Sequence, residues 1–191
     1  MTARYAQKRA PKPLDAPRLE ELGLAYVARF ATSAAKLQDY LRRKIRERGW
    51  EGEGPPPIAA LAEKFVDAGY IDDTAFARAK SGSLLRRGYG QQRVSQALYA
   101  AGINEDVRAQ VRAGEAAQRR AALALAKKRR FGPFGEGSGG GGGDRAIREK
   151  QLSAMLRAGH PLDSARELVN AASVGAAEEW AAMSDEDAPC D

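Results

Sequence analysis

Cysteine and histidine are nearly absent from this sequence, which contains one of each. Cys190 has no second cysteine with which to form a disulfide, and His160 has no second histidine or neighbouring cysteine with which to bind zinc. Long apolar runs are also lacking, because no stretch approaches the roughly 20 residues of a membrane-spanning helix. We therefore expect a protein without disulfides, metal, cofactor or membrane span, in which His160 has a structural role.

Strand patterns and catalytic groupings are scarce as well. Alanine, leucine, arginine, lysine and glutamate dominate at helical spacing, and no stretch alternates apolar and polar residues among β-branched positions. Acidic residues are scattered, and no nucleophile stands with a base. The run Gly139–Gly143 is not a phosphate-binding loop, because no Gly-Lys-Ser or Gly-Lys-Thr follows it. The sequence predicts an all-α protein that binds a partner, is not an enzyme and has no catalytic residues.

Positive charge exceeds negative charge. The formal net charge is +6 and the pI is near 9.6, which favours a polyanionic partner. Six acidic residues crowd the C-terminal end, which leaves the preceding body more basic than the total indicates: Glu178, Glu179, Asp185, Glu186, Asp187 and Asp191. The first 17 residues are basic and contain prolines, without the apolar stretch of a secretory signal, so we expect a disordered arm and a cytoplasmic protein.

Glycines mark the ends of several predicted helices. A glycine follows a helical pattern and precedes a bulky residue at four positions, Gly49, Gly69, Gly102 and Gly159. This arrangement is typical of a C-cap in which glycine adopts a left-handed conformation and the next side chain packs back on the helix. Candidate N-caps follow three of these stops, at Asp72 or Asp73, at Asn104 and at Asp163. The recurring unit is helix, glycine turn, helix.

Apolar faces predict the first two helices. The face of the first consists of Leu19, Leu22, Tyr26 and Phe30, and that of the second consists of Leu37, Leu41 and Ile45. The second helix is expected to begin at Thr32 or Ser33, whose hydroxyl can accept a bond from the first turn, and to end at Gly49.

A longer repeat is also present. The segments Arg87-Gly88-Tyr89-Gly90 and Arg129-Arg130-Phe131-Gly132 share the order arginine, spacer, aromatic, glycine. Once the glycine-rich insert at 135–143 is set aside, these landmarks and the capping glycines recur at one period. We therefore predict tandem three-helix repeats, similar to helix-turn-helix units, that stack into an elongated, curved molecule.

This interpretation divides the chain into five parts. They are a disordered basic arm at 1–17, a first repeat at 18–80 with a proline-rich insert at 51–57, a second repeat at 81–114, a third repeat at 115–172 with its glycine-rich insert at 135–143, and an acidic tail at 173–191.

The candidate binding surface is the basic face that remains when each helix buries its apolar stripe. It comprises Arg42, Arg43, Arg46 and Arg48, then Arg86, Arg87, Tyr89 and Arg93, then Lys127, Lys128, Arg129 and Arg130. An aromatic ring among arginines can stack on a base while guanidinium groups meet phosphate or carboxylate. The alternative for Tyr89 and Phe131 is that both plug the core where repeats meet.

Several of these segments together resemble the RecX family of regulatory proteins. They are Leu37, Leu41 and Ile45 with Arg48-Gly49-Trp50, then Gly69-Tyr70-Ile71-Asp72-Asp73 with Phe76-Ala77, then Arg86-Arg87-Gly88-Tyr89-Gly90 with Leu98, Gly102 and Ile103. The resemblance spans about 24–170. It implies three tandem three-helix repeats and a monomeric cytoplasmic modulator of the RecA recombinase filament on single-stranded DNA, most simply an inhibitor of its ATPase and strand exchange, in recombination, DNA repair and the SOS response.

The residues themselves also allow a second function. Helix, glycine turn and helix is also the outline of helix-turn-helix proteins that bind duplex DNA. The residue types that read base edges gather only at Gln91, Gln92, Arg93 and Gln96, so sequence-specific binding to duplex DNA is weakly supported.

Overall fold

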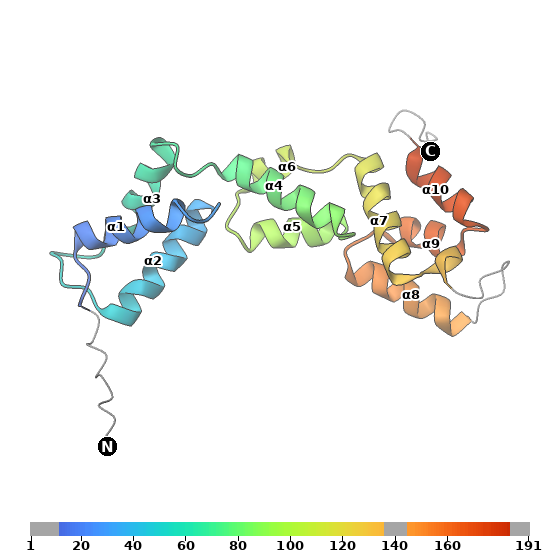
Figure 1. Ribbon diagram of the computed structural model, residues 1–191, viewed down its shortest axis with the longest axis horizontal. Coiled ribbons are helices and arrows are strands. Elements are labelled where there is room, and N and C mark those ends of the chain that lie inside the picture. The colour runs from blue at the N-terminus through green and yellow to red at the C-terminus, as the bar shows by residue number, and fades with distance from the viewer. Residues whose placement is uncertain (1–11, 136–144, 184–191) are drawn as a thin grey trace, which may run out of the picture. The chain divides into compact units, whose positions relative to one another are not determined.

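The protein is almost entirely helical. The computed structural model describes residues 12–135 and 145–183, which contain ten α-helices, one short 3-10 helix and no strand beyond a single isolated bridge (Figure 1). The predicted fold class, all-α with tandem helical repeats, is confirmed. Residues 1–73 form one compact unit and residues 74–191 another, here called unit 1 and unit 2.

Unit 1 contains α1 (Ala16–Val27), α2 (Ala34–Arg48) and α3 (Ile58–Asp67). Ser33 caps α2 as predicted, because its hydroxyl accepts a hydrogen bond from the N–H of Lys36 at 3.3 Å. The Asp73 carboxylate adds a second cap to the same helix by accepting from the N–H of Ala34 at 3.0 Å. The last residue of unit 1 thus stabilises the N-terminus of α2.

The core of unit 1 forms from the predicted apolar stripes, with one exception. Its buried residues are Leu14, Leu19, Leu37, Leu41, Leu61, Ala62, Phe65 and Ile71. Phe30 was predicted on the same face, but it lies beyond the end of α1 and is 52% exposed. The helix ends at Val27, and although the N–H of Phe30 still donates to the carbonyl of Tyr26 at 3.0 Å, Phe30 is not among the residues packed against the core.

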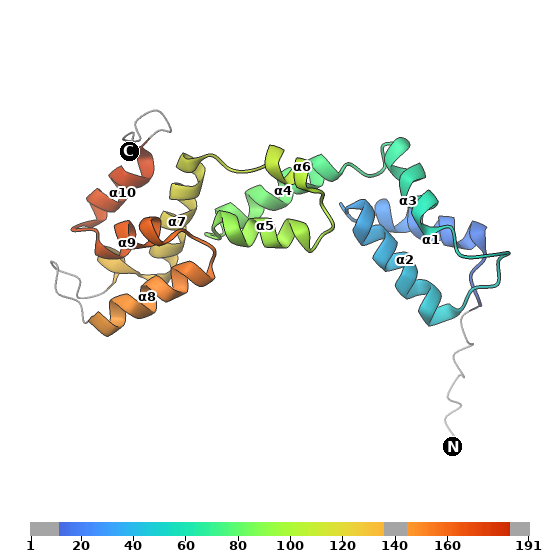
Figure 2. The ribbon, with the colours of Figure 1, turned by 180° about the vertical axis from the view of Figure 1, so that it is seen from behind.

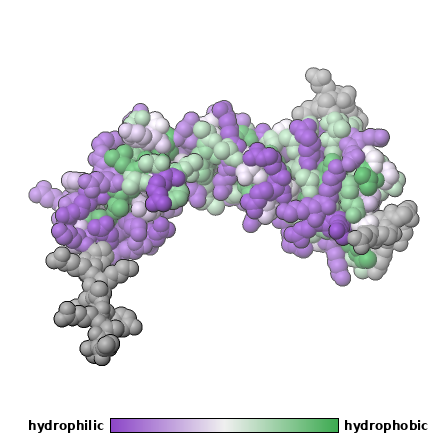
Figure 3. All heavy atoms as spheres, viewed as in Figure 1, coloured by the Kyte–Doolittle hydropathy of each residue, from purple (hydrophilic) through white to green (hydrophobic). Residues whose placement is uncertain are grey.

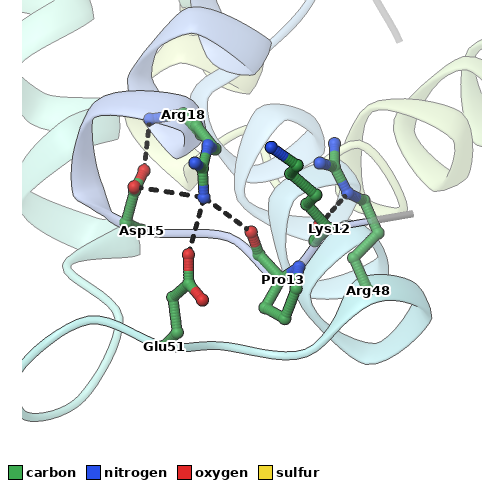
Figure 4. A network of polar contacts seen from close by, with 6 residues as sticks. All are labelled: Lys12, Pro13, Asp15, Arg18, Arg48 and Glu51. Carbon is green, nitrogen blue, oxygen red and sulfur yellow. Dashed lines mark hydrogen bonds and ion pairs between the residues drawn. The ribbon is translucent and has the colours of Figure 1, made fainter. Parts of the chain in front are cut away.

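The N-terminal arm is shorter than predicted. Leu14 is fully buried, and its backbone exchanges hydrogen bonds with Gly49 and Glu51 directly after α2. Arg18 strengthens this contact by donating to the Glu51 carboxylate at 2.6 Å (Figure 4). Residues 12–17 are therefore part of unit 1, because one buried leucine outweighs the polar, proline-containing composition around it. The rest of the predicted arm lies outside the described residues.

The second repeat comprises α4 (Asp73–Arg86), α5 (Gln91–Tyr99) and α6 (Glu105–Gln110). The predicted boundary between residues 80 and 81 is wrong, because it cuts through α4. Helix α4 contributes Ala77 to the same core as α5, which makes it the first helix of the second repeat. The buried residues of this core are Ala77, Val94, Leu98, Ala101 and Ile103.

The third repeat is larger than the others. It contains α7 (Glu115–Arg129), the 3-10 helix η1 (Gly132–Phe134), α8 (Arg145–Arg157), α9 (Leu162–Asn170) and α10 (Val174–Ala182), which pack together in both views (Figures 1 and 2). Its buried residues are Ala122, Leu125, Ala126, Met155, Ala165, Leu168, Val169 and Ala177.

The predicted acidic tail begins too early. Residues 174–182 form α10, whose Ala177 and Ala181 are each 1% exposed. Glu178 on this helix accepts a hydrogen bond from Lys127 Nζ at 2.6 Å. Acidic composition obscured an alanine face with helical spacing. Residues 184–191 of the predicted tail lie outside the described residues.

All four glycines follow helix ends as predicted, but Gly49, with a ψ of 166°, does not adopt the predicted left-handed helical conformation. The φ angles are +85° at Gly49, +75° at Gly69, +71° at Gly102 and +91° at Gly159. The residue after each of the last three donates its N–H back across the final turn, for example from Tyr70 to the Phe65 carbonyl at 2.9 Å. This is the bond pattern of the Schellman motif, which requires the left-handed residue between them.

The predicted N-caps have different outcomes. Asn104 caps α6 as expected, since its Oδ1 accepts from the N–H of Val107 at 2.8 Å. Asp163 is not an N-cap, because α9 begins at Leu162 and Pro161 occupies the capping position. Pro161 makes no capping hydrogen bond, and Asp163 lies in the first turn of α9, where the helix dipole favours a negative charge.

The two predicted inserts are described to different extents. In the proline-rich insert, Trp50 Nε1 donates to the Gly54 carbonyl at 2.8 Å, and Pro57 stands at the start of α3. The glycine-rich insert lies outside the described residues, apart from Gly135. None of the described helices has the length and apolarity needed to cross a bilayer.

Candidate functional site

The two arginine–aromatic–glycine segments converge on one hollow in unit 2. This hollow, here called the basic hollow, has a volume of about 230 Å³. Its lining comes from the turn after α4, from α7 and the residues after it, and from α8, and consists of Arg87, Tyr89, Leu125, Lys128, Arg129, Phe131, Ala154, Arg157 and Ala158. Segments that are alike in sequence but far apart along the chain thus form one site.

Equivalent backbone turns position the two aromatic rings. Gly88 and Arg130 both have left-handed conformations, with φ of +85° and +55°. The residue after each donates its N–H across the last helical turn, from Tyr89 to Leu84 at 3.1 Å and from Phe131 to Ala126 at 2.9 Å. A Cβ at Gly88 would lie 2.9 Å from the backbone nitrogen of Leu125 on α7. Glycine at this position therefore lets the α4 turn approach α7 closely enough to close the hollow.

The hollow concentrates positive charge. Four of its lining residues are cationic and none is acidic. Arg87 lies 5.3 Å above the Tyr89 ring, within the range of a cation–π contact. No carboxylate in the described ranges forms an ion pair with Arg87, Lys128, Arg129 or Arg157. The site is suited to an anion that supplies the missing charge.

Phe131 combines the two roles considered for the aromatic rings, and Tyr89 shows only one of them. Both rings line the hollow, and both are only partly buried. Phe131 also packs against the core that α7, α8 and α9 share. Phe131 therefore has one surface toward packed side chains and another toward the hollow, whereas Tyr89 is not among the residues packed against either core of unit 2.

The other predicted residues of unit 2 lie outside the lining. Arg86 is exposed, and Arg93 donates to Gln96 at 3.2 Å. Lys127 is directed to α10 by its ion pair with Glu178. Arg130 provides the left-handed turn described above. Figure 3 shows hydrophilic residues over much of the visible face around α8.

The α2 arginines belong to unit 1 and have partners within that unit. Arg42 bonds to Asp39 at 2.9 Å, and Arg43 lies 3.8 Å from the Glu47 carboxylate. Arg48 donates to the Lys12 carbonyl at 2.9 Å (Figure 4). Arg46 is exposed. Arg48 thus anchors the N-terminal segment, whereas Arg42, Arg43 and Arg46 line a shallow surface depression.

Sequence reasoning missed Arg157. This residue is in the last turn of α8, two positions before the capping Gly159, and completes the cationic lining of the hollow. The repeat gave no signal for it, because the residue two positions before the matching glycine of the second repeat, Gly102, is Ala100.

His160 joins the second and third repeats. It is 3% exposed, and its Nε2 lies 3.0 Å from the Gly88 carbonyl oxygen. Because a carbonyl oxygen can only accept a hydrogen bond, Nε2 is the donor. Burial lowers the pKa of His160, and the Gly88 bond opposes this shift more weakly. The predicted structural role is therefore consistent with a neutral imidazole at a repeat junction.

Unit 2 should lose stability as the pH falls from about 7 to 5. The pKa of His160 is depressed in the folded state, so the unfolded chain binds more protons below its usual pKa of about 6.5. The stabilising contribution is present above that pH and is lost as the pH falls toward the folded-state pKa. Urea unfolding at pH 7 and pH 5 should give a larger decrease for the wild type than for His160→Gln, which keeps an N–H donor but does not titrate. Equal decreases would contradict this assignment.

Comparisons with known proteins agree on one family. A family model of the second three-helix domain of RecX matches residues 72–111, which are α4 to α6. The regulatory protein RecX of Myxococcus xanthus (strain DK1622) is 29% identical over 168 residues, covering 84% of this chain and 88% of that protein. Regulatory protein RecX of Mycobacterium sp. (strain KMS) is 31% identical over 98 residues, 51% of this chain and 52% of that protein.

Solved structures support the fold. The crystal structure of RecX from Lactobacillus salivarius superposes with a TM-score of 0.61 at 16% identity, covering 80% of this chain and 93% of that one. A second crystal structure of regulatory protein RecX gives a TM-score of 0.61 at 18% identity, with coverage of 80% and 70%. At these identities the likeness concerns the arrangement of helices.

Proposed function

Because the chain belongs to the RecX family of regulatory proteins, we propose that it binds a RecA-type recombinase filament on single-stranded DNA and inhibits the ATPase and strand exchange of that filament. We infer that it does so in the cytoplasm, as a monomer, during recombination, DNA repair and the SOS response. This role is regulatory rather than enzymatic.

The basic hollow is the observation that supports this proposal most directly. Its four cations have no acidic partner in the described part of the chain, so phosphates or the carboxylates of another protein would complete the site. Tyr89 and Phe131 add ring surface on which a base can stack. A recombinase filament on DNA offers phosphates, bases and protein carboxylates within one groove.

Occupancy of that groove explains inhibition without catalysis. A protein docked along the filament blocks the approach of a second DNA molecule and restrains neighbouring recombinase protomers. The first effect lowers strand exchange and the second lowers ATP hydrolysis. The hollow requires only binding groups for this role, and its lining is cationic, aromatic or apolar.

Sequence-specific binding to duplex DNA has less support. Three of the four base-reading residues of α5 have partners within the protein: Gln91 accepts from the N–H of Ala113 at 3.3 Å, and Arg93 bonds to Gln96. Only Gln92 among them has no such bond in the described structure. A helix that reads bases needs several free polar groups along one face.

The proposal is tested by ATP hydrolysis of a RecA-type recombinase on single-stranded DNA, with this protein titrated at moderate salt. We expect inhibition at fewer than one protein per recombinase, because one bound molecule affects several protomers. Unchanged hydrolysis together with retained DNA binding would contradict filament targeting and favour the duplex-binding alternative. A duplex titration in the same buffer measures that alternative directly.

A further inference from the structure

Unit 1 carries three aromatic rings in contact at the end of α1 and on α2. Tyr26 and Tyr40 are stacked, with centroids 4.2 Å apart and planes 16° from parallel. Phe30 continues the group at 5.2 Å from Tyr26, with its plane tilted by 47°. We call these three residues the aromatic platform.

The platform is only partly explained by the core of unit 1. Tyr26 and Tyr40 pack against that core along one edge. Phe30 is not among the residues packed there, and it is 52% exposed. A half-exposed ring beside a stacked pair is available to a further flat partner.

Cations surround the same rings. Arg29 lies 5.7 Å from the centroid of Phe30, while Arg43 and Lys44 lie 5.6 and 5.8 Å from that of Tyr40. Arg43 and Lys44 share one carboxylate, that of Glu47. Arg29 has no ion pair within the described residues. The platform therefore has a net positive rim that can meet phosphates while the rings meet bases.

We propose that the aromatic platform binds single-stranded DNA by stacking its bases, with Phe30 as the outermost ring. Unpaired bases have free faces, whereas those of a duplex are covered by their neighbours. An acidic peptide would use the cations but would leave the stacked rings without a matching partner. This site belongs to unit 1, whereas the basic hollow belongs to unit 2. Its binding to free DNA does not depend on the proposed action on a recombinase.

The test compares two fluorescent oligonucleotides of equal length and charge, oligothymidine and its abasic counterpart, by anisotropy titration at fixed salt. The full-length wild type should bind oligothymidine more tightly. Phe30→Ala should reduce this preference about tenfold and leave affinity for the abasic strand unchanged, because only stacking is removed. Phe30→Trp should keep the preference, since tryptophan retains the stacking face.

Tyr70→Ala is the matched control. Tyr70 is also in unit 1 and is 60% exposed, but no cation lies over its ring in the described structure. We expect this variant to keep the wild-type preference. Equal wild-type affinities for the two strands, or equal losses on both strands in Phe30→Ala, would overturn the proposal. So would a Phe30→Ala variant that keeps the base preference but no longer inhibits a recombinase, because the platform would then be a protein-docking surface.

Discussion

Replacing Gly90 by alanine should destabilise unit 2 by about 3 kcal/mol, at the upper end of the range for overpacked sites. A Cβ at Gly90 would lie 2.2 Å from the carbonyl oxygen of Gly159 and 2.5 Å from the nitrogen of His160. Both are backbone atoms, which cannot rotate away as a side chain can. The φ of Gly90 is −79°, an ordinary value for alanine, so the cost comes from the close approach alone.

The same contact joins the second and third repeats by backbone hydrogen bonds. Gly90 donates to Ala158 at 2.9 Å and Gln92 donates to Gly159 at 3.2 Å. Displacing the turn before α5 to accommodate a methyl group therefore also breaks or lengthens these bonds.

Tryptophan fluorescence during urea unfolding can report the effect in each unit. Trp180 packs against the core of the third repeat, and Trp50 against that of unit 1. In a Trp50→Phe background, Gly90→Ala should lower the midpoint of the Trp180 transition; in a Trp180→Phe background, the Trp50 transition should stay in place. An unchanged Trp180 transition would contradict the close approach.

Gly82→Ala provides the control for glycine removal. Gly82 is inside α4, and the nearest atom to its added Cβ is the flexible end of Arg86, at 3.1 Å. Alanine is favoured over glycine in a helix by roughly 0.5–1 kcal/mol. The control should therefore be as stable as the wild type or more stable.

Removal of the hollow's positive charge should abolish the proposed inhibition of a RecA-type recombinase at substoichiometric levels. The variant Arg87→Gln/Lys128→Gln/Arg129→Gln removes three of the four cations and retains polar side chains. All three residues are exposed, so folding should be preserved. We expect at least a roughly tenfold higher protein concentration for half-inhibition, because each lost charge-assisted contact weakens binding. Affinity for single-stranded DNA should also depend less on salt, with a slope smaller by about 2.

A charge-matched variant distinguishes the hollow from general electrostatics. Arg78→Gln/Arg120→Gln/Lys150→Gln changes the net charge equally at three exposed positions of unit 2 outside the hollow. This variant should inhibit like the wild type, apart from a small loss due to the reduced overall field. If both triple variants lose inhibition equally, the hollow is not the binding site. Circular dichroism of both variants checks that the helices are intact.

Helix positions and helix ends could be predicted because nearby residues determine them. Gly69, Gly102 and Gly159 adopt left-handed turns for a reason within a few residues of each: a helix ends and a side chain at that position would be strained. The apolar stripe of α2 likewise follows from its own spacing. Arg130 has the same left-handed turn without glycine, so the end of α7 could be predicted only by comparison with the segment around Gly88.

The site could be predicted only in part. The repeated segments singled out Arg87, Tyr89, Lys128 and Arg129, which do lie together, but the same reasoning included Lys127 and Arg93 and omitted Arg157. The direction of a long cationic side chain depends on partners elsewhere in the chain. Glu178 of α10, which attracts Lys127, was interpreted as part of an acidic tail.

The sequence by itself determined an all-helical chain of repeated three-helix units, their turns and the family to which they are similar. Only the tertiary structure decided that Gly90 approaches Gly159, that Asp73 caps α2, that Leu14 is buried and that two basic segments enclose one hollow. Periodicity and capping depend on residues that are close together in the sequence, so a short stretch of sequence is enough to predict them. Contacts between distant segments depend on how whole helices pack, and no short window contains that information.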